Sequence, residues 1–211
     1  MIHGGWWCSA YNRSIEISTA TDLINRGIPV WNIDYRSRGN GGGWPNTFYD
    51  VGNATDLLVS VANQTGLSAS KTIVTGHSAG GELSLWAASR FKQPDGAPGA
   101  NPVWRPIAAV SQAGALDMVD AYEKNLGNNA VYYFLGCAPA QCPTRYQHTS
   151  PTTLVPLGIP TLVVSGYNDT VVPYNQAQLY NASAVRAHDN VTTYLLQPAY
   201  MTRNLRLGGI P

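Results

Sequence analysis

The stretch Thr72–Trp86, TIVTGHSAGGELSLW, decides how the rest of the chain is interpreted. It reads as a β-branched strand, a G-x-S-x-G turn and a helix, which is the pattern of a nucleophile elbow. Gly76 and Gly80 flank the turn, where a β-carbon would collide with the neighbouring strand or helix. The motif is short, but the strand before it and the helix after it are the context that it requires. We predict that Ser78 is a nucleophile; the alternative is a structural serine in a glycine-rich turn.

Apolar runs and helical patterns alternate along the chain. The predicted strands are residues 28–35, 72–78, 106–114, 161–169 and 191–197. The predicted helices are residues 15–26, 48–63, 80–91 and 175–187. Most of the strands are apolar throughout, as in buried parallel sheets, so the pattern predicts an α/β fold with a mainly parallel sheet.

The length of the chain fits a single domain spanning residues 1–211. Between about residues 117 and 160 the periodicity weakens, and we expect an irregular insertion over the edge of the sheet. No internal repeat is present.

The composition bears on the kind of partner. The formal net charge is +1 and only 12% of residues are charged, so the chain lacks the basic patch of a nucleic-acid binder. No run of about 18 apolar residues suggests a membrane span, and the N-terminus MIHGGWW lacks the layout of a signal peptide. We expect a small-molecule substrate, without a nucleic-acid or membrane partner; the sequence does not predict the oligomeric state.

Two weaker features favour a secretory origin slightly over a cytoplasmic one. Asn-x-Ser/Thr acceptor sites occur at Asn12, Asn53, Asn63, Asn168, Asn181 and Asn190. Cys137 and Cys142 are spaced to close a small loop in an oxidising compartment, which would leave Cys8 unpaired. The alternative is three reduced thiols in a cytosolic protein, so the localisation stays open.

A serine hydrolase also needs donors for the tetrahedral oxyanion. The backbone amide after the nucleophile belongs to Ala79, at the start of a helix. The motif HGGWW, residues 3–7, resembles the loop that supplies the second donor, which places Gly4, Gly5 and Trp6 in the predicted oxyanion hole. His3 is expected to fix this loop rather than to act as the base.

The acid that orients the histidine is expected after a later strand, because the chain order in this architecture is serine, acid, histidine. Asp169 stands at the end of the predicted strand 161–169 and meets this requirement. The alternative is a turn-forming residue beside Asn168, and one aspartate can serve both purposes.

The chain resembles the α/β-hydrolase esterases, in particular the kynurenine formamidase (arylformamidase)-like branch. The motifs that carry the resemblance are HGGWW, DYRSRGNGGGWPNTFYDV, GHSAGGELSLW and SPTTLVPLGIPTLVVSGYNDTVVP, and the likeness extends to about Ala199. It implies a three-layer sandwich around a mainly parallel, eight-stranded sheet and hydrolysis of carboxylic esters or aryl formamides without a metal or other cofactor. In this family, Ser78 would be the nucleophile and Asp169 the acid.

Both ends depart from the family pattern. The HGG loop of such enzymes follows an interior strand, yet only Met1 and Ile2 precede His3, so we expect the first strands to be lacking. The family histidine follows the last strand, where this chain reads LLQPAYMTRNLRLGGIP.

Three other histidines are weaker candidates for the base. His188 is expected at the opposite end of the sheet from Asp169. His77 is expected to line the pocket, and His148 could approach its mouth. The histidine of the triad is therefore not found in this chain.

Three functions remain open. The first is a serine hydrolase whose full sequence supplies the missing strands and histidine. The second is a catalytically inactive relative that binds a ligand, and the third is a serine peptidase of the prolyl-oligopeptidase type. The aromatic residues Trp6, Trp7, Trp44 and Tyr167 either rim the pocket or pack the loops.

Overall fold

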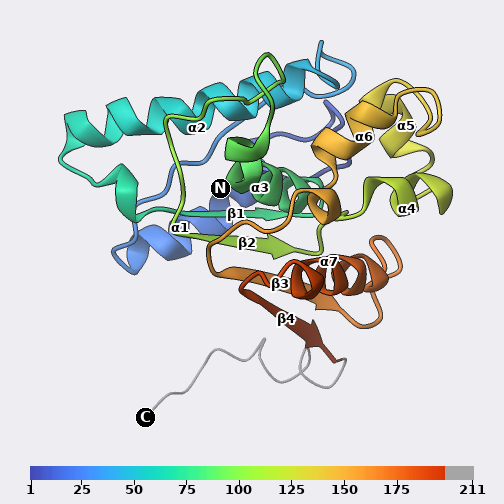
Figure 1. Cartoon of the computed structure of the whole chain (residues 1–211). Coiled ribbons are helices and arrows are strands. Elements are labelled where there is room, and N and C mark those ends of the chain that lie inside the picture. The colour runs from blue at the N-terminus through green and yellow to red at the C-terminus, as the bar shows by residue number, and fades with distance from the viewer. Residues whose placement is uncertain (198–211) are drawn as a thin grey trace.

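The computed structural model describes residues 1–197, and its centre is a parallel sheet of four strands (Figure 1). The strands are β1 (Ile73–His77), β2 (Ala108–Gln112), β3 (Thr161–Gly166) and β4 (Val191–Leu196), in the spatial order β1-β2-β3-β4. The register pairs His77 with Gln112 and Gly166 with Leu196, so the carboxyl ends of the four strands share one edge of the sheet. These four strands confirm four of the five predicted from the sequence.

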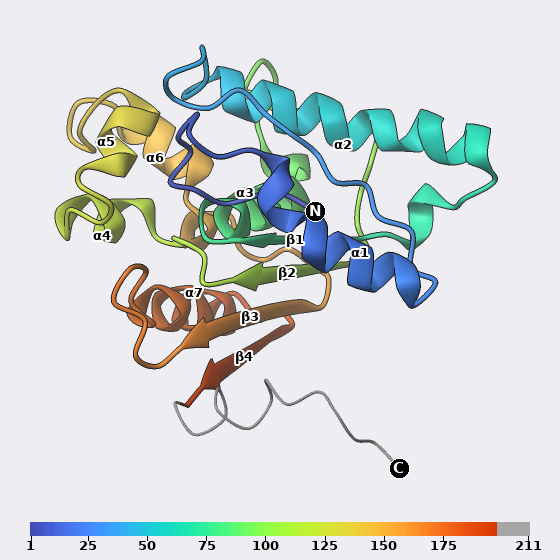
Figure 2. The same cartoon turned by 180° about the vertical axis from the view of Figure 1, so that it is seen from behind.

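The helices cover the two faces of the sheet unequally. They are α1 (Ile17–Asn25), α2 (Asn46–Thr65), α3 (Ala79–Ser89), α4 (Met118–Glu123), α5 (Ala130–Leu135), α6 (Pro143–Thr149) and α7 (Asn175–Arg186). Short 3₁₀ turns occur at Arg13–Glu16, Ala69–Lys71, Arg90–Lys92 and Pro151–Thr153. Helices α3 and α7 pack on one face, α2 lies over α3, and α1 lies on the other face (Figures 1 and 2).

The prediction of a strand over residues 28–35 is wrong. Within this run only Ile33 forms a bridge, and its partner is Ile2, which also bridges Gly76 of β1. The Ile2 amide donates to Thr75 O at 2.9 Å, and Ile33 N donates to Met1 O at 3.1 Å. A strand needs a neighbour along its whole length, and only Met1 and Ile2 lie between this run and β1.

The segment 117–160 is also more regular than expected. Instead of an irregular insertion at the edge of the sheet it contains α4, α5 and α6, of six or seven residues each. It packs against the core beside α3: the indole of Trp86 donates to His148 O at 3.1 Å, and the ring of Phe134 stacks on that of Trp7. Helices this short do not give a readable apolar period, which is why the sequence pattern did not predict them.

Helix α3 lies in the middle of the core. All eleven of its residues are buried, whereas most helices in the chain have an exposed side. The ring of Phe48 in α2 packs edge-on against Trp86 with centroids 4.8 Å apart. The helix that follows Ser78 is therefore held from all sides.

Candidate active site

Ser78 has the backbone conformation of a nucleophile elbow. It joins β1 to α3 with φ 55° and ψ −121°, in the sparsely populated region that such a turn imposes. Its carbonyl accepts the amide of Gly81 at 2.8 Å, so the helix begins at once. A β-carbon on Gly76 would overlap the carbonyl of Gly80, and one on Gly80 would overlap the carbonyl of Ile2. Both glycines are thus required by close backbone approach.

The HGGWW loop runs against the serine. A β-carbon on Gly4 would lie 3.1 Å from Cβ of Ser78 and 2.6 Å from the carbonyl oxygen of His77. Beyond it, Gly5, Trp6 and Trp7 have φ angles of 106°, 54° and 51°. Three successive residues in this region are unusual, and such strain persists only where the surroundings fix it.

The predicted oxyanion donors come from this loop and from the start of α3. Ala79 is the first residue of the helix, so its amide has no intrahelical acceptor. Within residues 1–197, the amides of Gly5, Trp6 and Ala79 donate to no acceptor. These N–H groups remain free to bind an oxyanion, and the role of Gly4, Gly5, Trp6 and Ala79 in the hole stays a prediction.

His3 holds the loop through both ring nitrogens. Nδ1 lies 2.8 Å from Gly4 O and Nε2 lies 3.0 Å from Oδ1 of Asp34. The ring is fully buried and stacks on Tyr35 at 4.1 Å, and the Tyr35 hydroxyl donates to His3 O at 2.8 Å. With both nitrogens engaged, His3 fixes the loop, in agreement with its expected role.

Asp169 lies in the turn after β3, at the carboxyl edge of the sheet. Its Oδ1 accepts the amides of Val171 at 2.9 Å and Val172 at 3.0 Å, so it does form the turn. Its Oδ2 accepts no hydrogen bond from residues 1–197. One oxygen shapes the loop while the other is free for a partner, which keeps both proposed roles compatible.

A cavity of about 480 Å³ opens beside Asp169. It follows the carboxyl ends of all four strands, and its lining includes His77, Gln112, Gly166 and Leu196. Ligand sites in open parallel sheets lie at this edge, outside the carboxyl ends of the strands. His77 is exposed and lines the cavity, as expected.

The two remaining histidines lie elsewhere. His148 Nδ1 pairs with Gln93 Oε1 at 3.0 Å, beyond the far end of α3, and burial lowers its pKa. That helix is about 16 Å long, so the expectation that His148 could approach the mouth is wrong. His188 precedes β4, at the opposite end of the sheet from Asp169. Within residues 1–197, no histidine nitrogen is hydrogen-bonded to Ser78 or Asp169.

The tryptophans divide between core and surface. Trp7 is fully buried, with its ring stacked on Phe134 at 4.5 Å, and Trp44 packs on Phe48 at 5.5 Å. For Trp7 the rim interpretation is wrong, because Phe134, distant in the sequence, covers its ring. Trp44 is only half-buried and packs on a ring of the next helical turn, so it stays a candidate for the rim. Trp6 is half-buried, and Tyr167 is 45% exposed, so these two remain candidates for the rim.

Glu82, near the serine, was not among the residues predicted from the sequence. It lies in the first turn of α3 with no exposed surface, and its Oε2 accepts the indole N–H of Trp7 at 3.1 Å. Burial raises the pKa of its carboxyl well above the ordinary value, and the Trp7 hydrogen bond opposes that rise only in part. The signal was in the sequence: AGGELSLWAAS is apolar or small on every side of the helix except at this glutamate.

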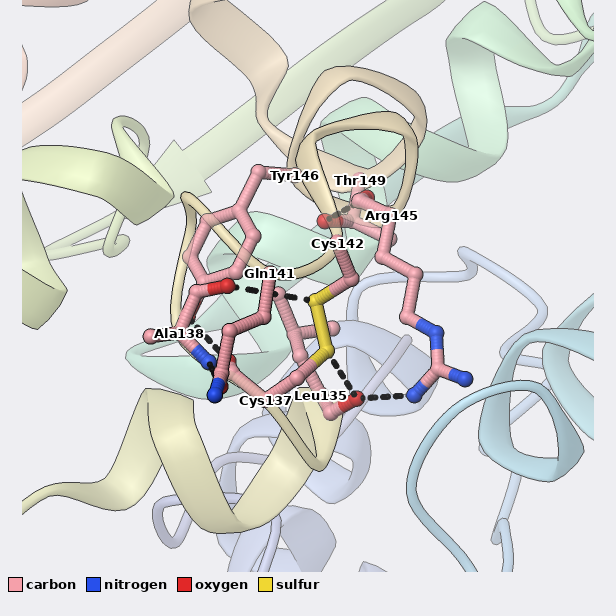
Figure 3. Close-up of a disulfide and its surroundings, with 8 residues drawn as sticks. All are labelled: Leu135, Cys137, Ala138, Gln141, Cys142, Arg145, Tyr146 and Thr149. Atoms are coloured by element: carbon pink, nitrogen blue, oxygen red, sulfur yellow. Dashed lines mark hydrogen bonds between the residues drawn. A yellow bond between two sulfur atoms is a disulfide. The ribbon is translucent and has the colours of Figure 1, made fainter.

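Cys137 and Cys142 form a disulfide in the loop between α5 and α6 (Figure 3). Their Cα atoms are 6.2 Å apart, and Cys8 is a free thiol. Arg145 donates to Leu135 O at 2.7 Å and Tyr146 donates to Cys137 O at 2.9 Å, so both sides of the loop are tied to α6 (Figure 3). Of the six acceptor asparagines, all but the half-buried Asn181 are exposed.

Residues 1–197 hold neither a metal-ligand cluster nor a helix suited to crossing a membrane. Over this range, no group of three or more His, Cys, Asp or Glu side chains is placed to hold a metal ion. No helix in the same range is long and apolar enough to cross a bilayer.

Comparison with known proteins identifies the lineage. A family model, BD-FAE, matches residues 1–183. No curated protein matches the chain. Similar solved structures include a truncated carbohydrate esterase from gut microbiota, which has a TM-score of 0.80 and 23% identity over 93% of this chain and 75% of that one.

Two more structures share the fold. An acetyl ester-xyloside bifunctional hydrolase from Caldicellulosiruptor lactoaceticus has a TM-score of 0.77 and 17% identity, covering 98% of this chain and 75% of that one. Esterase B from Lactobacillus rhamnosis has a TM-score of 0.78 and 20% identity, covering 94% of this chain and 64% of that one. At these identities the likeness shows the α/β-hydrolase fold, which confirms the predicted fold class; the arylformamidase-like branch is not confirmed.

Proposed function

The chain belongs to the BD-FAE family, and from this premise we propose that it is a serine hydrolase that cleaves carboxylic esters through an acyl-enzyme on Ser78. The observation that carries the proposal is the geometry of Ser78. Its strained turn, with φ 55°, places the serine at the start of a buried helix and against Gly4 of the HGGWW loop. A structural serine in a turn requires neither the strain nor the glycine loop against its β-carbon.

In the proposed reaction, Ser78 Oγ attacks the ester carbonyl carbon while a base removes its proton. The carbonyl oxygen becomes an oxyanion and accepts hydrogen bonds from the amides of Ala79 and of the Gly5–Trp6 stretch. The tetrahedral intermediate collapses, the alcohol leaves with a proton, and Ser78 carries the acyl group. Water then attacks the acyl-enzyme by the same route and releases the acid.

The base of this mechanism is the open part of the proposal. The free Oδ2 of Asp169 is available to orient a histidine, and the cavity between Asp169 and His77 has room for a side chain. We propose that a histidine hydrogen-bonded to Asp169 in this cavity is the base; none of the four histidines in residues 1–197 makes that bond.

A second candidate function rests on the placement of the four histidines. Since none is bonded to Ser78 or Asp169 within residues 1–197, the chain is also a candidate for a ligand-binding relative without turnover. Removing the base from a serine triad reduces turnover by roughly a millionfold, so the two candidates differ sharply in rate.

Labelling with a fluorophosphonate probe separates the two candidates. An activated Ser78 reacts covalently, and Ser78→Ala abolishes the labelling while leaving the circular-dichroism spectrum unchanged. A folded wild-type chain that takes up no probe would refute the hydrolase proposal for this chain and favour ligand binding.

The substrate class is tested with a panel. The names of the similar structures include an acetyl ester hydrolase and a carbohydrate esterase, so we expect the highest kcat/KM with short-chain acetyl esters, including acetylated carbohydrates. An aryl formamide tests the arylformamidase-like prediction, and a proline-linked aminoacyl substrate tests the peptidase alternative. If the aryl formamide or the proline-linked substrate is hydrolysed faster than the acetyl esters, the protein is an arylformamidase or a peptidase and not an acetyl esterase.

A further inference from the structure

Glu82 is a buried titratable group that the proposed reaction does not use. It is the only charged-type residue of α3, its side chain has no contact with solvent, and it lies one helical turn after Ser78. A carboxyl group in such a place is costly unless it has a partner, so an apolar residue would be the simpler choice. The side chain therefore calls for an explanation.

The partner of Glu82 lies in the oxyanion loop. Oε2 accepts the indole N–H of Trp7 at 3.1 Å, which joins the first turn of α3 to a residue 75 positions earlier in the chain. The other oxygen, Oε1, is buried and has no hydrogen-bond partner within residues 1–197. The carboxyl group thus makes a single protein hydrogen bond, and that bond reaches the loop.

Trp7 is the far end of the strained stretch that carries the predicted oxyanion donors. Gly5, Trp6 and Trp7 all have positive φ, and such a conformation persists only when side chains on either side over-determine it. The ring of Trp7 is fully buried and stacks on Phe134 with an interplanar angle of 8°. The hydrogen bond to Glu82 adds a directional contact at the indole N–H, which fixes the ring to the first turn of α3.

We propose that Glu82 is a positioning residue that anchors Trp7 and thereby fixes the oxyanion loop relative to Ser78. Ser78 and Glu82 share one rigid helical turn, in which the Glu82 amide also donates to Ser78 O at 3.2 Å. The nucleophile and the anchor of its oxyanion donors therefore move as one body. This inference rests on the proposed ester hydrolysis for its kinetic consequence, but the anchoring itself does not.

The test compares three variants of the full chain. Glu82→Leu replaces the carboxyl by an apolar group of similar size, Glu82→Gln keeps an acceptor oxygen, and Trp7→Phe keeps a stacking ring without the N–H. Loss of an oxyanion donor lowers kcat by about 100- to 1,000-fold, and misplacement of a donor is expected to cost part of this. We expect E82L and W7F to lower kcat for an acetyl ester at least about tenfold with little change in KM, and E82Q to recover most of that loss.

A matched control shows whether any lost indole bond has the same effect. Trp104 is also buried, and its N–H donates to Thr72 Oγ1 at 2.8 Å, at the opposite end of β1 from Ser78. Trp104→Phe is expected to lower stability without a selective fall in kcat. If Trp104→Phe lowers kcat as much as W7F does, the positioning role is refuted. It is also refuted if E82L keeps the kcat of the wild type, or if E82Q is as slow as E82L.

A second readout does not depend on activity. In the ¹⁵N spectrum of the chain the Trp7 indole signal is assigned by its absence in W7F, and its hydrogen exchange reports the bond to Glu82. We expect slow exchange in the wild type and in E82Q and fast exchange in E82L. Equal exchange in wild type and E82L would overturn the anchoring even if esters are hydrolysed, whereas slow wild-type exchange without turnover would refute only the proposed function. If E82L does not fold, W7F and E82Q carry the test.

Discussion

Burial of Glu82 makes the stability of the protein depend on pH in a direction opposite to that of a paired carboxylate. Its pKa is raised in the folded protein above the value of 4.5 that it has when exposed, chiefly by desolvation. Well below pH 4.5 the group is neutral in both states and adds nothing to the pH dependence of stability. Above that pH the unfolded chain releases a proton that the folded chain keeps, so folding becomes less favourable as the pH rises.

The linkage relation gives the size of this effect. Between pH 4.5 and the raised pKa, the free energy of unfolding falls by up to about 1.4 kcal/mol for each pH unit. Glu82→Gln removes the titration but keeps an oxygen for the Trp7 indole, so the variant should lack this slope. A domain has only about 5 to 15 kcal/mol of stability, so the difference is large enough to measure.

The assay is urea unfolding followed by circular dichroism at half-unit steps from pH 4.5 upward. We expect E82Q and the wild type to be nearly equally stable at pH 4.5 and E82Q to gain steadily above it. Glu123→Gln, at an exposed position of α4, is the control and should run parallel to the wild type. If the curves of E82Q and the wild type stay parallel over the whole range, Glu82 is not held neutral and the reasoning fails.

Three further predictions concern other parts of the molecule. Gly4→Ala places a β-carbon 2.6 Å from His77 O and should lower ester turnover or probe labelling at least about tenfold. Gly27→Ala has open space around it, so its positive φ of 77° should cost some stability while turnover and labelling stay unchanged. Arg90→Leu removes a buried guanidinium from Asp56, which is partly exposed and keeps two backbone N–H donors, and should cost about 1 to 3 kcal/mol of unfolding free energy. Arg26→Ala, in the exposed pair with Asp22, should cost about 0 to 1 kcal/mol, and equal losses would refute the role of burial. Replacing Cys137 and Cys142 by serine opens a loop with a sequence separation of 5 and should cost about 2 kcal/mol, measured by urea unfolding, and an unchanged midpoint would contradict this.

The elbow could be predicted from the sequence because its causes are local. Gly76 and Gly80 are needed for contacts within a few residues or across one neighbouring segment, and the apolar run before them forms β1 as predicted. The helices 48–63 and 175–187 were likewise recognisable from their own periodicity and correspond to α2 and α7.

The failures concern features that depend on distant residues. Residues 28–35 have the composition of a strand, but pairing depends on a neighbour, and the neighbour has only two residues. Whether Trp7 rims a pocket or packs in the core is decided by Phe134, far along the chain. Spacing alone did not decide whether Cys137 and Cys142 are oxidised, since it suits both a disulfide and two thiols.

The enclosure of α3 has a consequence for changing the specificity of the protein. Since every residue from Ala79 to Ser89 is buried, most substitutions there destabilise the fold, and only the variants that still fold can be compared for activity. A library aimed at new substrates would therefore lose most of its members if it targeted this helix. The loop of residues 123–129, whose Gly127 lies against the Trp6 ring, and the turn around Tyr167 carry exposed side chains, so variation there can explore new acyl and alcohol groups while the nucleophile stays in place.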